Sequence, residues 1–209
     1  AEGRCGGYMD VTDFPEAAEA AFQPVLNLAS LDPKEQSTVT PMLKRANEGD
    51  LLAIVTKLSS YKNRYYDSPT GVESANWIKG QYELIAKGNP DIEVDLVAHK
   101  FRQPSVVATI AGNGPNKNEI VIVGGHIDSI TGFGGDTHAP GADDNASGTA
   151  TVLEAFRHIV ESGFKPNRTI QFMGYAGEEK GLLGSQDIAA QYRKKGHTVV
   201  GVLQLDMTM

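Results

Sequence analysis

From residue 120 onward, strand-like and helix-like apolar patterns alternate along the chain. Residues 120–123 (IVIV) form a continuous apolar run, which is typical of a strand buried on both faces. The patterns that follow predict, in order, a helix at 146–159, a strand at 169–175, a helix at 185–194 and a strand at 199–205. Strands joined by helices pair in parallel through right-handed crossovers. We therefore predict an α/β fold, a three-layer sandwich with a mostly parallel central sheet.

The residues before this alternation predict further elements around the same sheet. Apolar residues at helical spacing predict helices at 51–61 and 72–86. Alternating or β-branched patterns predict strands at 92–97 and 105–110. Nearer the N-terminus, an Ala- and Glu-rich run predicts a helix at 14–27.

Charge and cysteine content narrow the range of partners. The formal net charge of −7 and the lack of a basic stripe argue against nucleic-acid binding. No apolar run approaches the roughly 18 residues that a membrane span needs, so no membrane association is expected. The sequence does not open with a positively charged segment followed by an apolar one, the pattern of a secretory signal. We expect any such signal to have been removed. Cys5 is the only cysteine, so it is a free thiol or pairs with a thiol outside these residues.

Acidic residues and a histidine gather at the predicted strand ends. Ligands of an open parallel sheet bind beyond the carboxyl ends of its strands. An imidazole together with several carboxylates is the ligand set expected for one or two divalent metals. The sequence therefore predicts a metal site built from residues at this edge of the sheet, namely His126, Asp128, Asp143, Asp144, Glu178, Glu179 and Asp206.

Each of these residues also has a structural interpretation. Residues 143–145 could cap the helix that follows them, and residues 178–179 could complement a helix dipole. His126 and Asp128 could form a hydrogen-bonded loop pair, and Asp206 could simply end a strand. Their joint occurrence at one end of one sheet favours the metal site.

Other candidate chemistries find less support. His138 is expected to be solvated, and His99, His158 and His197 have no acidic companion in sequence, so we interpret them as structural or surface residues. The chain lacks a Gly-x-Ser-x-Gly elbow, a Walker loop and a dinucleotide-binding glycine motif. Cys5 lies outside the predicted α/β core, without a neighbouring histidine, which argues against a thiol nucleophile.

Four segments together resemble the signatures of co-catalytic zinc aminopeptidases, and are similar to the secreted leucyl aminopeptidases of Gram-negative bacteria. The likeness runs from about Thr38 to the end and includes residues 61–66 and 75–78. It divides the chain into an N-terminal extension or prosegment, residues 1–37, and the N-terminal part of a catalytic domain, residues 38–209. The four segments are 125–129 (GHIDS), 140–148 (PGADDNASG), 175–182 (YAGEEKGL) and 203–208 (LQLDMT).

The resemblance implies that Asp144 bridges two zinc ions. His126 and Asp206 would complete one site. Glu179 and a histidine beyond this sequence would complete the other, which is one ligand short in this chain. The final strand is apolar enough to lie inside a sheet, so we expect a sheet that is incomplete at its C-terminal end. A second, C-terminal segment of the same polypeptide would complete both the sheet and the metal site.

The same resemblance assigns roles to the remaining residues. Asp128 would orient His126, Glu178 would be the general base, and Met207 could line a substrate pocket. The implied activity is a secreted, extracellular aminopeptidase that uses a metal-bridging water to release an apolar, leucine-like residue from a peptide with a free N-terminus. The alternatives are a carboxypeptidase or glutaminyl cyclase on the same scaffold, or a non-catalytic, ectodomain-like binding module.

Overall fold

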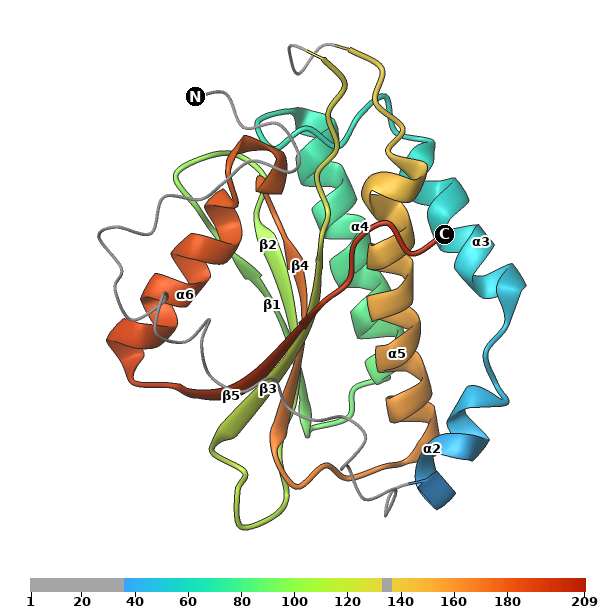
Figure 1. Ribbon diagram of the computed structural model, residues 1–209, viewed down its shortest axis with the longest axis vertical. Helices are drawn as coiled ribbons and strands as arrows, with labels where there is room; N and C mark the ends of the chain where they lie inside the picture. The colour runs from blue at the N-terminus through green and yellow to red at the C-terminus, as the bar shows by residue number, and fades with distance from the viewer. Residues whose placement is uncertain (1–35, 133–136) are drawn as a thin grey trace, which may run out of the picture.

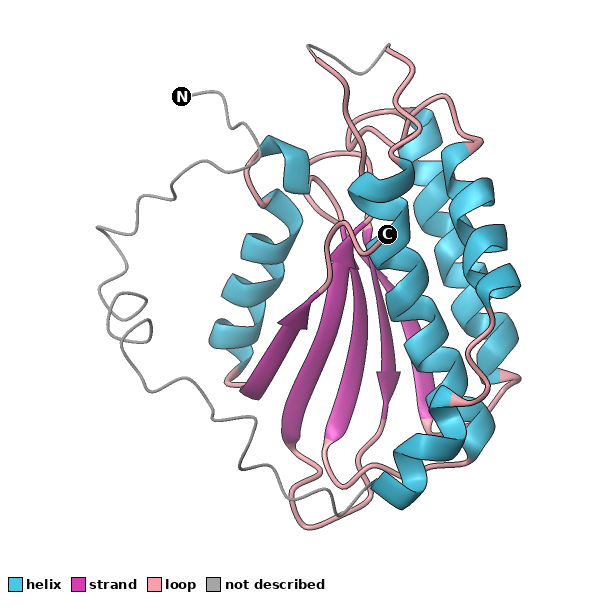
Figure 2. Ribbon diagram, turned by 45° about the vertical axis from the view of Figure 1, so that its right-hand side comes forward, coloured by secondary structure: helices cyan, strands magenta, loops and turns pink. Residues whose placement is uncertain are grey.

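The computed structural model describes residues 36–132 and 137–209. Cys5, the helix expected at 14–27 and all but the last two residues of the expected extension lie outside the described residues. Within them the chain forms a single sheet between two layers of helices (Figures 1 and 2). The predicted three-layer α/β fold is therefore confirmed.

The sheet is mixed, and one of its strands runs against the others. Its order is β1-β2-β4-β3-β5, and β3 pairs in parallel with both β4 and β5. β2 pairs antiparallel with β1 and with β4, so β1 runs in the direction of β4 and only β2 is reversed. The strands are β1 (Ile92–Val97), β2 (Ser105–Ile110), β3 (Glu119–His126), β4 (Thr169–Tyr175) and β5 (Thr198–Gln204).

The helices lie on both faces of this sheet. Figure 2 shows α6 on one face and α3, α4 and α5 on the other. α2 was not predicted from the sequence; it contains Pro41 and lies against α5. The helices are α2 (Gln36–Leu43), α3 (Glu48–Ser59), α4 (Pro69–Ala86), α5 (Gly148–Ser162) and α6 (Leu183–Lys195).

Capping residues explain why α3 and α4 begin three residues before their apolar patterns do. Asn47 precedes α3, and its side chain accepts a hydrogen bond from the backbone N–H of Gly49. Ser68 caps α4 in the same way through Gly71, and Pro69 occupies the first turn, where no backbone donor is needed. These polar first turns lie outside the apolar faces on which the sequence prediction depended.

The alternation of side chains along β2 separates two cores. Val106 and Ala108 face α3, α4 and α5, whereas Val107 faces α6. In the larger core, the ring of Phe156 on α5 packs edge-on against Tyr82 at 4.9 Å and Phe172 at 5.3 Å between ring centroids. These three rings connect α4, α5 and β4.

β5 lies at the edge of the sheet and exposes apolar side chains. Val202 is 62% exposed and Leu203 is 56% exposed. Together with α6, β5 borders an apolar cleft of roughly 590 Å³ that is also lined by Ile122, Met173 and Tyr192. An apolar strand with one open edge matches the expectation of a sheet that is incomplete at this end.

None of the helices in the described parts of the chain combines the length and apolar character that crossing a membrane requires.

The three aromatic rings of the larger core provide a test of how that core is packed. Phe156→Ala should reduce the free energy of unfolding by about 3–5 kcal/mol, because it removes a fully buried ring and leaves a cavity. Denaturant unfolding of the purified protein measures this change. Leu84→Ala is the control, since Leu84 is 68% exposed and should change stability little. Equal losses in the two variants would contradict the assigned core.

Candidate metal centre

β3 carries the first candidate residues to the edge of the sheet. The strand continues through Gly124 and Gly125 to His126, beyond the apolar run that predicted it. A Cβ on Gly125 would lie 2.9 Å from the carbonyl oxygen of Leu205, so glycine allows the segment after β5 to pass close to β3. His126 is buried at the end of the strand, opposite Tyr175 of β4.

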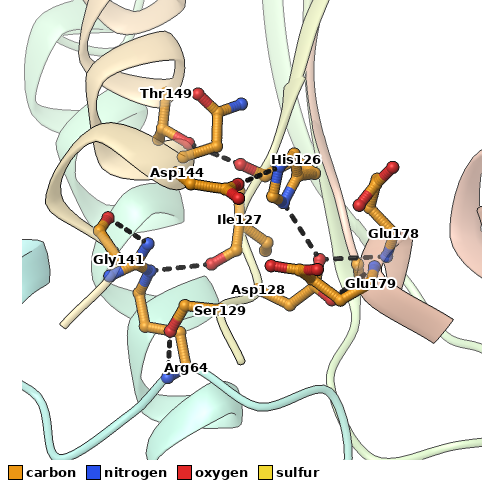
Figure 3. Close-up of polar contacts among 12 residues, drawn as sticks. Arg64, His126, Ile127, Asp128, Ser129, Gly141, Asp144, Thr149, Glu178 and Glu179 are labelled. Carbon is orange, nitrogen blue, oxygen red and sulfur yellow. Dashed lines mark hydrogen bonds and ion pairs between the residues drawn. The ribbon is translucent and has the colours of Figure 1, made fainter. Parts of the chain in front are cut away.

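Asp144 lies in an irregular turn, η2 (Ala142–Ser147), ahead of α5. Its backbone dihedral angles are non-helical, as are those of Asn145, and α5 begins at Gly148. Figure 3 shows the Asp144 carboxylate beside the imidazole of His126. The capping interpretation applies to Asn145, whose Oδ1 accepts a hydrogen bond of 2.9 Å from the N–H of Gly148. Asp144 instead faces the strand end.

Three of the predicted side chains converge at the carboxyl ends of β3 and β5. His126 Nε2 lies 3.0 Å from Asp144 Oδ1 and 3.5 Å from Asp206 Oδ1. One ligand atom of each residue lies within 4.8 Å of the others. The two distances from His126 Nε2 are shorter than the roughly 4 Å that can separate two ligand atoms each about 2 Å from one cation. The imidazole is 1% exposed, whereas the carboxylates of Asp144 and Asp206 are 38% and 34% exposed. The group therefore opens to solvent on its acidic side.

Negatively charged side chains surround the imidazole of His126. Burial alone would lower the pKa of His126, but hydrogen bonds to Asp128, Asp144 and Asp206 outweigh burial and raise that pKa to about 12. The hydrogen bond from His126 also lowers the pKa of Asp144. The carboxylates thus hold a positive charge on the imidazole, and a divalent cation could take the place of that proton. One imidazole nitrogen and two carboxylate oxygens fit zinc.

Asp128 ties the end of β3 to the turn after β4. Its Oδ1 lies 3.4 Å from His126 Nδ1 and also accepts a hydrogen bond of 3.0 Å from the N–H of Glu178. Its Oδ2 accepts a hydrogen bond of 3.1 Å from the N–H of Glu179 (Figure 3). This one buried carboxylate therefore lies beside the imidazole and holds the backbone of Glu178 and Glu179 near it.

Glu178 and Glu179 open a one-turn helix, η3 (Glu178–Lys180), with half-buried side chains. Burial raises the pKa of Glu178. Burial, followed by the negative charges of Asp144 and Asp128, raises the pKa of Glu179 to about 7. Carboxyl groups with raised pKa values can exchange protons near neutral pH or bind a cation that restores their ionised form. Glu179 does not belong to the three-residue group around His126.

Arg64 is the residue that sequence reasoning missed. Its buried guanidinium donates to the carbonyl oxygens of Ile127 at 2.9 Å and Gly141 at 2.9 Å, and also to that of Pro140 (Figure 3). Its backbone N–H donates to Ser129 Oγ at 3.0 Å. Burial lowers the pKa of Arg64 to about 10, although Asp128 and other acids of the site counteract the shift. Arg64 lies within residues 61–66, which belong to the family resemblance, but no pattern in the sequence indicates its contacts.

The contacts of the other histidines partly correct the interpretation that they lack acidic companions. His99 does have an acidic companion, since its Nδ1 lies 2.6 Å from Asp187 Oδ2, and its Nε2 lies 2.8 Å from Ser105 Oγ. His158 Nε2 lies 4.0 Å from a carboxylate oxygen of Glu154 on the same helix. Asp187 comes from a distant element, which the sequence does not reveal, whereas Glu154 lies one turn before His158 on the helix that the sequence predicts. His138 is exposed, as expected.

Met207 follows Asp206 in a left-handed backbone conformation and is exposed. Its N–H donates to Asn145 Oδ1 at 3.2 Å. The assignment of its side chain to a substrate pocket stays a prediction.

Known proteins share both this sequence and this fold. The sequence model described as Peptidase family M28 matches residues 105–209. The chain is 42% identical over 206 residues to a probable leucine aminopeptidase of Arthroderma benhamiae, and the match covers 97% of this chain and 57% of that protein. The likeness therefore extends beyond bacterial proteins to a fungal one.

Solved structures give the same result. The crystal structure of LapB from Legionella pneumophila matches with 32% identity and a TM-score of 0.79, over 97% of this chain and 57% of that one. The LapA aminopeptidase of the same organism matches with 31% identity and a TM-score of 0.76, over 90% and 50%. The chain thus spans little more than half the length of the relatives it matches.

Arg64 provides a test of how the ligand-bearing loops are held. Arg64→Met should lower the free energy of unfolding by at least about 3 kcal/mol, because it leaves several buried carbonyl oxygens without a donor. Arg102→Met is the matched control: its side chain is 63% exposed and 3.6 Å from Asp67, a pair worth about 0–1 kcal/mol. Denaturant unfolding of both variants measures the difference. A loss at Arg64 no larger than at Arg102 would show that the carbonyl network contributes little.

Proposed function

This chain belongs to peptidase family M28, and we propose that it forms part of a zinc-dependent aminopeptidase that removes an apolar, leucine-like N-terminal residue from peptides. The observation that carries the proposal is the convergence of His126, Asp144 and Asp206 at one edge of the sheet. The leucine aminopeptidase names of its relatives support the substrate class. Since the chain covers 57% of such a relative, the proposed activity is that of the whole protein.

The proposed ligands combine the resemblance with the distances. His126, Asp144 and Asp206, of which Asp144 lies 3.0 Å from the imidazole, would hold one zinc ion, and Asp144 together with Glu179 would take part in holding a second. Asp128 orients the imidazole. A zinc ion held here supplies Lewis acidity, because it lowers the pKa of a water molecule and polarises a carbonyl group.

Glu178 is proposed as the residue that moves the proton. Its backbone is fixed by Asp128, its side chain is half-buried, and burial raises its pKa. A carboxylate with a raised pKa can take a proton from the attacking water and return it to the leaving amine, a contribution of about 10²–10⁴-fold to the rate.

A further segment of the same polypeptide is proposed to complete the sheet and the second metal site. Two observations support it: the edge strand β5 exposes Val202 and Leu203, and the relatives extend well beyond the matched region. Such a segment would pair with β5 and provide the remaining ligand of the ion beside Glu179.

Metal removal tests the proposed activity. Treatment of the full-length protein with a chelator should abolish hydrolysis of leucine p-nitroanilide, and added zinc should restore it. N-acetyl-leucine p-nitroanilide is the control substrate and should stay intact, because an aminopeptidase requires the free amine. Undiminished hydrolysis without metal would overturn the proposal. Cyclisation of N-terminal glutamine in place of leucine release would identify a glutaminyl cyclase.

Two substitutions separate the proposed roles of the acids. Glu178→Gln should keep the metal content near that of the wild type and lower kcat by about 10²-fold or more, because it removes a proton carrier. Asp144→Asn should instead lose metal, because a neutral amide is a poor bridge between two cations. Elemental analysis of the purified proteins, together with steady-state kinetics, measures both effects. Equal metal loss in the two variants would refute this division of roles.

A further inference from the structure

The side chain of Asn145 contacts the peptide groups on both sides of Asp206. Its Nδ2 donates to the carbonyl oxygen of Leu205 at 3.0 Å. Its Oδ1 accepts from the N–H of Met207 at 3.2 Å and from the N–H of Gly148 at 2.9 Å. The side chain of Asn145 is fully buried, and its bond to Gly148 is buried with it, whereas its bonds to Leu205 and Met207 are partly buried. One planar amide therefore brackets the backbone of a proposed zinc ligand.

The backbone around this bracket is closely packed. A Cβ on Gly148 would lie 2.3 Å from Asn145 Oδ1 and 2.5 Å from the carbonyl oxygen of Leu205. A Cβ on Gly125 would lie 2.9 Å from the same carbonyl oxygen. The segment after β5 is thus held between the end of β3 and the start of α5, with no space for another side chain.

Residues beyond the bracket are tied to the same turn by separate bonds. The N–H of Thr208 donates to Ser147 Oγ at 2.9 Å, and the N–H of Met209 donates to Asp143 Oδ1 at 3.2 Å. In Figure 1 this C-terminal segment crosses the N-terminal end of α5. These bonds hold the chain after the bracket, whereas Asn145 alone among them contacts both neighbours of Asp206.

We propose that Asn145 is a positioning residue of the metal centre, which fixes the backbone of Asp206 so that its carboxylate meets His126. The inference rests on the proposed function, because it gives Asp206 the role of a zinc ligand. Asn145 directly follows Asp144, so a single turn presents one proposed ligand and orients another from a distant strand. Outer residues that orient ligands change metal affinity by about 10- to 100-fold when they are replaced.

A role limited to helix capping is the competing explanation, and the chemistry of the side chain separates the two. Serine at position 145 can still cap α5, since serine is nearly as good an N-cap as asparagine. Its short hydroxyl cannot bracket the peptide groups of Leu205 and Met207. Aspartate can keep the acceptor bonds to Gly148 and Met207, but it replaces the donor to Leu205 with a carboxylate oxygen that repels the carbonyl oxygen of Leu205.

The experiment measures metal affinity in the full-length protein. Metal-free wild type, Asn145→Ala, Asn145→Ser and Asn145→Asp are titrated with zinc against a chromophoric chelator and with cobalt by its visible absorption. Thermal unfolding of each metal-free protein is recorded in parallel. Ile78→Ala is the control for instability alone, since it opens a cavity in the core from α4, which provides none of the ligands.

The alanine and serine variants should bind zinc about 10- to 100-fold more weakly, with an altered cobalt spectrum, and the aspartate variant, which keeps the bond to Met207, should lose less affinity than they do. Ile78→Ala should unfold at lower temperature with unchanged affinity. Wild-type affinity in Asn145→Ser would overturn the inference and leave a helix cap, and this comparison holds even where Asn145→Ala does not fold. Failure of the wild type to bind metal would overturn the proposed function, and the inference with it.

Discussion

The parallel pairing of β3 with both β4 and β5 is the constraint on which the rest of the structure depends. Parallel neighbours end at the same edge of a sheet, so the segments after the three strands meet there. His126 comes from the first, Glu178 and Glu179 from the second, and Asp206 from the third. With any of these strands reversed, its acidic residues would lie at the opposite end of the sheet.

Several carboxylates that lie close together and are partly buried repel one another and lose hydration. This costs free energy unless positive charges and hydrogen-bond donors compensate for it. The structure supplies both: the imidazole of His126 lies between two carboxylates, backbone N–H groups bind Asp128, and the guanidinium of Arg64 fixes the loops on which the acids lie. Burial, and after it the negative charges of Asp144 and Asp128, raise the pKa of Glu179 to about 7. A cation bound here would balance the negative charge of these carboxylates.

The same polar groups serve structure and site together. The amide of Asn145 accepts from the first N–H of α5 and also binds the chain around Asp206, and Asp128 binds two peptide N–H groups while lying 3.4 Å from an imidazole nitrogen. The structural interpretations of these residues are therefore not alternatives to the functional one. A turn or strand end that must hold a ligand in place needs its own backbone groups satisfied, and neighbouring side chains of the site provide the partners.

The sequence by itself indicated most of the elements and the residues that converge. Apolar periodicity located β4 at its observed bounds, and the motifs at two strand ends and before one helix identified His126, Asp206 and Asp144. Pairings between distant segments were decided only by the tertiary structure: the reversed β2, the contact of His99 with Asp187, and the buried network of Arg64. Periodicity records which side of an element faces the core, because burial acts on each side chain separately. A hydrogen bond depends on where two backbones meet in space, and no local pattern in the sequence carries that information.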